Sequence, residues 1–224
     1  HTGVIHAVSR HGRLSQRHSI FQPRPLESLP AEFASPVRAL RWIRQEVKKA
    51  QHVGDDWRAV VDGLRPHTAV IWQGWSNAQR ASFLRHGRNL WDVHRHRMAP
   101  EIGNQLDQLV LQDVLKIHAA RLIRAQSDGL LANVTVQSAH SNQVLTLQVA
   151  RVINCTGPGR DFSRVNHPLI RQMRQAGWLH PDPLRLGILT GANGGLTGVD
   201  GRDIPGLYTL GPLRIPALWE SVAM

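Results

Sequence analysis

The sequence is poor in the residues that crosslink a chain or bind soft metals, since its 224 residues include a single cysteine, Cys155. One thiol forms no internal disulfide and no Cys-based zinc or iron–sulfur site, so the cytoplasmic compartment is expected. No stretch reaches the roughly 18 consecutive apolar residues of a transmembrane helix. The first residues lack the basic flank and apolar run of a signal peptide. The sequence therefore predicts no membrane partner.

Lysine and acidic residues are also scarce, whereas arginine is abundant. The chain has 3 Lys and 24 Arg against 16 acidic residues, and +9 of its net charge of +11 lies in residues 1–100. Guanidinium groups match the oxygens of phosphates and carboxylates. The excess of arginine therefore indicates an anionic ligand, a nucleic-acid surface or only a GC-rich codon bias. A hydrophobic fraction of 42% with 19% charged residues is typical of a globular protein.

The common catalytic signatures are missing: there is no Gly-x-Ser-x-Gly, no P-loop and no Gly-x-Gly-x-x-Gly. His94 and His96 are spaced like neighbouring ligands on one face of a strand. However, no third ligand follows at a metal-binding spacing, and the adjacent arginines disfavour a dication. A packed cluster of Arg, His and Asp, facing an anionic ligand, is the favoured interpretation. The sequence assigns no metal ligand and no catalytic residue.

Periodicity and capping predict the elements of the first half of the chain. Residues 4–8 predict a buried strand that leads into a polar turn, and the prolines of residues 14–30 predict irregular structure. Residues 31–114 hold 5 of the 7 tryptophans and are expected to be mostly helical. Helix starts are indicated by Ser35 with Pro36, Asp55 with Asp56, Ser76 and Pro100. The second of these helices is expected to stop at Arg65 and Pro66.

The pattern changes to strands after residue 115. Three β-rich segments joined by turn residues predict a β-meander, and they are residues 117–124, 131–137 and 144–149. Residues 151–155 predict one more strand. The remaining expected elements are a short helix at 168–176, a glycine-rich loop at 191–206 and a final strand at 207–210.

The turn after the first predicted strand carries Ser9, Arg10, His11 and Arg13 with no acidic residue nearby. In a dinucleotide-binding βαβ unit, the end of the second strand faces the adenosine ribose. An acid there favours NAD, whereas Ser and Arg can hold the 2′-phosphate of NADP. The turn is therefore a candidate phosphate site. A solvated basic loop is the alternative, because no glycine fingerprint precedes the strand.

Two further glycine turns follow later predicted strands. Thr156 and Gly157 end one of them abruptly, which lets the backbone approach a ligand closely. Gly211 ends the last predicted strand, and a helix start at Trp219 follows, an arrangement that can present backbone N–H groups to a ligand. An ordinary tight turn is the alternative at Thr156 and Gly157, and each of these signals by itself is common.

Taken together, these segments resemble the bacterial FAD/NAD(P)-binding oxidoreductases that carry two dinucleotide-binding folds, which are distantly similar to flavin-dependent N-hydroxylating monooxygenases. The matching stretches span nearly the whole chain in the family's order. They are residues 9–12, 56–66, 83–86, 91–100, 154–158 and 218–221. The long central stretches are the most specific, whereas the Thr-Gly turn and the last glycine occur in many flavoproteins.

The resemblance implies an α/β fold with partial doubly wound, Rossmann-like sheets, a helical insertion and a β-meander. It assigns residues 1–25 and 115–155 to the remainder of an NAD(P)-binding domain. Residues 26–114 would be the helical insertion, and residues 156–224 the closing part of an FAD-binding domain. Since both glycine fingerprints would lie upstream, the resemblance also implies that the chain is an internal or C-terminal fragment of a larger protein.

Residue roles follow from the same resemblance. Ser9 and Arg10, next to His11 and Arg13, would hold the 2′-phosphate of NADP. Thr156 and Gly157 would form the crossing towards FAD. The residues expected near the isoalloxazine end are Gly211, Leu218, Trp219 and Glu220. The chain departs from the family at His11, where a second Arg is frequent, and at Pro212, where an Asp often holds the ribitol.

The implied function is that of a flavin-dependent oxidoreductase that passes hydride from NADPH to FAD. Hydroxylation of a small-molecule substrate would follow by analogy alone. The isolated chain is expected to be inactive. Two other classes stay open, a basic nucleic-acid-binding module and a non-catalytic interaction module. The single tyrosine, the four phenylalanines and the helix-core positions of the tryptophans disfavour nucleic acid, because stacking platforms are not evident.

Overall fold

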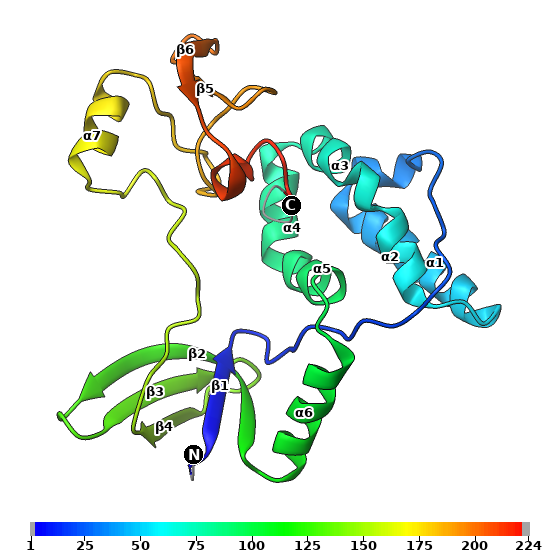
Figure 1. Ribbon diagram of the computed structural model, residues 1–224, viewed down its shortest axis with the longest axis vertical. Coiled ribbons are helices and arrows are strands. Elements are labelled where there is room, and N and C mark those ends of the chain that lie inside the picture. The colour runs from blue at the N-terminus through cyan, green and yellow to red at the C-terminus, as the bar shows by residue number, and fades with distance from the viewer. Residues whose placement is uncertain (1–2, 221–224) are drawn as a thin grey trace. The chain divides into compact units, whose positions relative to one another are not determined.

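The computed structural model of the chain describes residues 3–220 (Figure 1). It divides into two compact units. Unit 1 consists of His1–Ile20 and Arg88–Gly157, and unit 2 consists of Phe21–Gly87 and Pro158–Met224. Each unit therefore joins two stretches that are far apart in the sequence.

Unit 1 is built on a four-stranded mixed sheet with the order β1-β2-β3-β4 (Figure 1). β1 (Ile5–Ser9) pairs in parallel with β2 (Leu115–Ser127). β3 (Ala132–Ser138) and β4 (Val144–Val149) continue the sheet as an antiparallel meander. The described part of the chain is thus an α/β protein with one parallel strand pair at one edge of its main sheet.

Two helices of unit 1 precede β2 in the chain, α5 (Arg88–Arg95) and α6 (Pro100–Leu111). Pro100 stands in the first turn of α6, where its missing N–H has no helical partner to lose. A parallel pair requires a crossover connection, and α6 delivers the chain to the start of β2. The first residue of β1 is fixed there, since Ile5 N–H donates to the carbonyl of Val114 at 2.7 Å.

The hydrophobic core of the sheet forms on one face of the meander. Val134 and Val136 alternate along β3 and are buried together with Ala120 of β2 and Leu147 of β4. Asp128 closes the turn between β2 and β3. Its Oδ1 accepts hydrogen bonds from the N–H groups of Leu130 and Leu131, at 3.0 and 2.8 Å. These backbone bonds lower the pKa of the Asp128 carboxyl.

The first stretch of unit 2 is helical, and local capping explains where its helices begin. Asp56 accepts a hydrogen bond from the Arg58 N–H, and Ser76 forms a capping box with Gln79. The helices are α1 (Pro36–His52), α2 (Trp57–Gly63), α3 (Thr68–Gly74) and α4 (Asn77–His86), with short 3-10 turns at Ala31–Ala34 and Arg65–His67.

An aromatic cluster ties the two stretches of unit 2 together. Trp72 is 1% exposed, and its ring lies 4.6 Å from that of Trp219 and 6.3 Å from that of Phe83, between centroids. Its Nε1–H donates to the carbonyl of Pro216 at 2.9 Å. Trp75, also buried, packs on Phe83. Trp72 and Phe83 of the helical stretch thus pack against Trp219, near the end of the described residues.

The second stretch of unit 2 has its own small core of Leu179, Ile188 and Leu196. Around it lie α7 (Pro168–Gln175), the hairpin of β5 (Gly195–Thr197) with β6 (Asp203–Tyr208), and a 3-10 turn at Gly211–Arg214. Ile170 and Met173 of α7 pack against this core. One face of α7 is therefore fixed, and the opposite face is left to solvent.

The structure confirms most predicted elements: the strand into Ser9, the irregular stretch after it, four helix starts, the meander and the helix before residue 176. The predicted burial of the first strand is wrong, since Ile5 is 43% exposed and Val8 is 37% exposed. The predicted strand at residues 151–155 is wrong. This segment is irregular, and Ile153 is 74% exposed, because it pairs with no strand among residues 3–220. The glycine-rich loop contains β5, and the last strand is β6, which starts at Asp203.

The second helix stops as predicted, since α2 ends at Gly63, just before Arg65 and Pro66. Pro66 stands in the first turn of a 3-10 helix, where its missing N–H is tolerated, and the chain continues into α3. The sequence analysis also missed α5, because no capping residue announces it. No helix among the described residues is both long enough and apolar enough to cross a bilayer.

Candidate functional site

The carboxyl end of β1 carries the first group of predicted site residues. β1 ends at Ser9, opposite Ala119 of β2, and a tight turn follows in which Ser9 Oγ accepts from the Gly12 N–H at 3.0 Å. Gly12 has a φ of +58°, and a Cβ there would lie 3.0 Å from both the Cβ and the N of Ala119. Glycine therefore lets the turn close onto β2, which holds residues 10 and 11 at the end of the sheet.

The side chains of this turn form an exposed cationic group. Arg10, His11 and Arg13 are all exposed. Arg13 Nη1 donates to Oδ1 of Asn89 at 3.1 Å, whereas the Arg10 side chain has no hydrogen bond or ion pair with any described residue. No acidic residue occurs in the first 26 positions. The Arg10 guanidinium is therefore available to an anion from solution.

This arrangement fits a phosphate monoester. The Ser9 hydroxyl accepts from Gly12 and keeps its own hydrogen for donation. Arg10 adds a planar set of N–H donors that suits phosphate oxygens. The structure confirms that a parallel strand leads into Ser9 and Arg10. That these residues bind the 2′-phosphate of NADP stays a prediction.

A histidine pair lies on the same two strands. Nδ1 of His6 on β1 and Nε2 of His118 on β2 are 2.9 Å apart, so one nitrogen donates and the other accepts. The pKa of His118 is lowered, first by partial burial and then by the charges of His6 and Lys116. The two histidines are 112 residues apart in the sequence, so no local pattern indicates this pair.

Thr156 and Gly157 lie in an exposed, irregular segment at the end of unit 1. The N–H and the Oγ1–H of Thr156 both donate to Oδ1 of Asn154, at 3.0 and 2.7 Å. Gly157 has a φ of +77° with no atom within 4 Å of the position of a Cβ. The segment is an Asn-initiated turn, and its own hydrogen bonds account for its conformation.

The last group of predicted residues lies in unit 2 and takes part in its packing. Gly211 has a φ of +71° and opens the 3-10 turn that leads to Leu218, whose N–H donates to the Arg214 carbonyl at 2.7 Å. Trp219 packs against the aromatic cluster, 5.3 Å from Phe83. Glu220 is half-buried. The helix expected from Trp219 falls largely outside the described residues, as does Ser221.

The predicted site residues therefore fall into two groups that belong to different units. Ser9, Arg10, His11 and Arg13 lie at the end of β1 in unit 1, with Thr156 and Gly157 in the same unit. Gly211 and residues 218–220 lie in unit 2.

The histidines at positions 94 and 96 lie in and just after a helix, not on a strand. His94 lies within α5, and its Nδ1 is 2.8 Å from the carbonyl of Leu90, one helical turn back. Arg88 pairs with Asp92 on the same helix at 3.2 Å. The two-residue spacing therefore does not place both rings on one face of a strand. Among the described residues, no group of three or more His, Cys, Asp or Glu could hold a metal ion.

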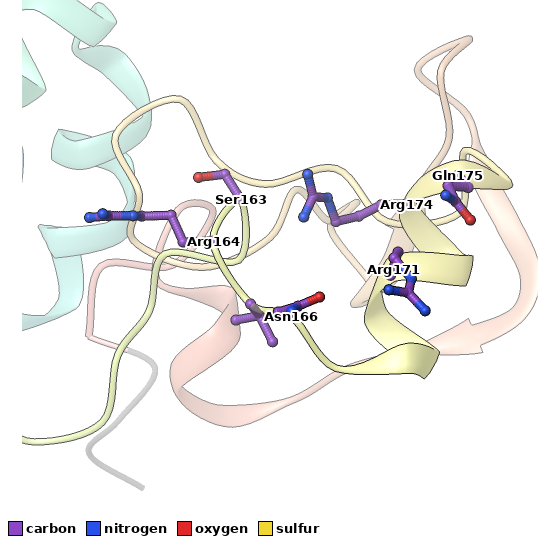
Figure 2. A pocket seen from close by; sticks show the side chains of 7 residues that line it. Ser163, Arg164, Asn166, Arg171, Arg174 and Gln175 are labelled. Atoms are coloured by element: carbon purple, nitrogen blue, oxygen red, sulfur yellow. The ribbon is translucent and has the colours of Figure 1, made fainter.

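One pocket of unit 2 was not indicated by the sequence analysis. It has a volume of about 440 Å³ and lies between residues 163–166 and α7 (Figure 2). Three arginines line it, Arg164, Arg171 and Arg174, and no acidic residue does. A run such as residues 164–174 resembles any arginine-rich surface segment, so only the fold shows that these side chains line one cavity.

The fold and the site define an α/β protein in which the parallel strand pair β1–β2 ends in an exposed, cationic Ser-Arg turn. Comparisons of the chain with protein-family models, with curated proteins and with solved structures find no match. The function is therefore argued from the residues themselves.

Proposed function

We propose that the chain provides the NADPH-binding part of a flavin-dependent oxidoreductase, with Ser9 and Arg10 as the ligands of the 2′-phosphate. The observation that carries this proposal is the end of β1, where a parallel strand delivers Ser9 beside β2 and leaves Arg10 exposed. Ligands of open α/β sheets bind outside the carboxyl ends of the parallel strands.

Charge supports NADPH over NADH. A carboxylate at this strand end would accept from the 2′-OH of NADH and would repel a phosphate. The turn has Ser9 and Arg10 instead, with exposed His11 and Arg13 beside them. A charge-assisted hydrogen bond from Arg10 to the phosphate is worth roughly 1.5–3 kcal/mol.

The doubly wound sheet is part of the same proposal. Only one edge of β1 is paired among residues 3–220, with β2. In a dinucleotide-binding sheet, the strand that carries the glycine-rich turn would pair with the free edge, and the pyrophosphate would lie at the following helix. The assignment of residues 156–224 to the closing part of an FAD domain belongs to this proposal as well.

The fit to FAD is weaker than the fit to NADP. The positive φ of Gly211 allows a close approach to its backbone, but the indole of Trp219 packs against Trp72 and Phe83 inside unit 2. FAD would supply the acceptor for hydride, and a small molecule would be the final substrate. The residues of this chain define no step of that transfer, and its role is to bind and orient NADPH.

Paired nucleotides test the proposal. NADPH and NADH differ only by the 2′-phosphate, so their dissociation constants from the chain can be compared by isothermal titration calorimetry. We expect Arg10→Ala to weaken NADPH about 10- to 100-fold and to leave NADH nearly unchanged, as the loss of one charge-assisted bond requires. Arg124→Ala is the matched control, since Arg124 lies on β2 in the same unit and is exposed.

Three results would contradict the proposal. Equal losses for both nucleotides in Arg10→Ala would remove Arg10 from the 2′-phosphate. A similar loss in Arg124→Ala would show that net charge, and not the turn, attracts the nucleotide. Failure of the unmodified chain to bind NADPH would contradict an NADPH site carried by this chain.

A nucleic-acid-binding module is the second candidate, and the excess of 24 Arg favours it. Sequence-independent binding to single strands needs aromatic platforms open to bases. Trp72 and Trp75 are buried and are not available for stacking. This candidate predicts oligonucleotide binding that weakens steeply as salt rises.

A further inference from the structure

The pocket beside α7 has features of a ligand site that are independent of the NADPH proposal. Its volume of about 440 Å³ lies within the range of small-molecule sites. Arg171, Arg174 and Gln175 line it from α7, and Ser163, Arg164 and Asn166 line it from the segment before the helix. The lining has three positive charges and no negative one.

The packing of α7 explains why two of these arginines face the pocket. Ile170 and Met173 are held against the core of Leu179, Ile188 and Leu196, which fixes the rotation of the helix. Arg171 and Arg174 are three residues apart and therefore lie on one side of the helix. Figure 2 shows Arg174 extending from α7 towards the segment that carries Asn166.

These two guanidinium groups have no protein partner. Neither the Arg171 nor the Arg174 side chain has a hydrogen bond or an ion pair within the described part of the chain. Two like charges three residues apart on a helix destabilise it slightly. An anion between them would remove this repulsion and supply the missing acceptors.

The nearest acidic group in the preceding segment is already engaged. Asp161 accepts from the hydroxyl of Ser163 and lies 3.7 Å from Arg185. The hydrogen bond from Ser163 and then the neighbouring arginines lower the pKa of Asp161, so its carboxylate stays charged. Arg164, whose charge acts on Asp161, extends away from α7 in Figure 2. Asp161 therefore does not neutralise Arg171 or Arg174.

We propose that this pocket binds a small organic dianion through the forks of Arg171 and Arg174, with the Asn166 amide as an additional donor. A guanidinium donates two parallel bonds to phosphate or carboxylate oxygens, so a phosphate monoester and a dicarboxylate share the required chemistry. The volume exceeds what a single inorganic phosphate fills, which points to an anion with an organic part.

Calorimetry with the 224-residue chain tests this site, with glycerol 3-phosphate and succinate as probes at constant ionic strength. We expect saturable binding of at least one probe to the pocket. The double variant Arg171→Ala with Arg174→Ala should weaken it at least tenfold. The matched control is Arg41→Ala with Arg44→Ala, which removes two exposed arginines with the same spacing from α1 of the same unit.

Comparing glycerol 3-phosphate with succinate shows whether the pocket prefers a phosphate or a dicarboxylate. The variants show whether the probe binds at Arg171 and Arg174. Arg174→Lys keeps the charge and loses the fork, so an intermediate affinity is expected for a bidentate contact. Thermal melting of each variant checks that it folds. The proposal is overturned if neither probe binds at millimolar concentration, if the control weakens binding as much as the pocket variant does, or if only oligonucleotides bind.

Discussion

The turn after β1 depends on one glycine, and its replacement gives a sharp test of how the turn closes. Gly12→Ala places a Cβ 3.0 Å from the Cβ and from the N of Ala119, where carbon atoms normally stay about 3.5–4.0 Å apart. The residue also has a φ of +58°, which an L-residue adopts at a cost of about 1–2 kcal/mol. Both effects act on the same turn.

The expected loss of stability can be divided between them. Overpacking of this kind typically costs about 1–3 kcal/mol, because β2 cannot retreat without disturbing its pairing with β3. Together with the backbone strain, Gly12→Ala should therefore destabilise the chain by roughly 2–5 kcal/mol. Gly54→Ala is the reference for strain alone, since Gly54 has a φ of +80° with no atom within 4 Å of the added Cβ.

Urea unfolding followed by far-UV circular dichroism measures both variants, and hydrogen exchange of the β1 peptide locates the change. A double-mutant cycle with Ala119→Gly isolates the contact between the two side chains. The reasoning is refuted if Gly12→Ala costs no more than Gly54→Ala and shows no coupling to position 119. In that case the turn would not close onto β2, and Arg10 would have no fixed place.

Two further predictions concern stability and protonation. Trp72→Phe should cost about 1–3 kcal/mol in thermal unfolding, because the buried carbonyl of Pro216 loses its hydrogen bond; an unchanged melting temperature would contradict this contact. The pKa of His118 should lie below 6.5 by NMR titration. Because the pKa of His118 is lower in the folded state than in the unfolded state, the folded chain should lose stability as the pH falls through 6.5 towards the folded-state pKa, and should keep its full stability above 6.5. The variant His6→Ala removes one cause of the lowering and should therefore raise the pKa of His118.

The starts of helices and the end of the first strand were predictable from the sequence, because one or a few neighbouring residues determine them. Asp56 and Ser76 announce their helices because their side chains cap the first N–H groups, and both caps form. The strand into Ser9 was predictable because its apolar run is followed by a glycine turn. These signals need only a few neighbouring residues.

Features that depend on distant partners were not predictable. Residues 151–155 have the composition of a strand, but no described strand pairs with them, so composition alone misleads. His6 meets His118 only because β1 and β2 pair. The pocket arginines share a cavity only because Met173 and Ile170 fix the rotation of α7. Each of these outcomes requires knowledge of which segments meet.

The interleaving of the two units has a consequence for synthesis of the chain. Ile5 pairs with Leu115, so β1 leaves the ribosome 110 residues before its partner and must wait while Phe21–Gly87, which belongs to the other unit, is made. Closing so long a loop slows folding. During this interval, the exposed amides of β1 are open to any other extended strand. Neither unit can be excised as one continuous segment, because each consists of two stretches that are far apart in the sequence.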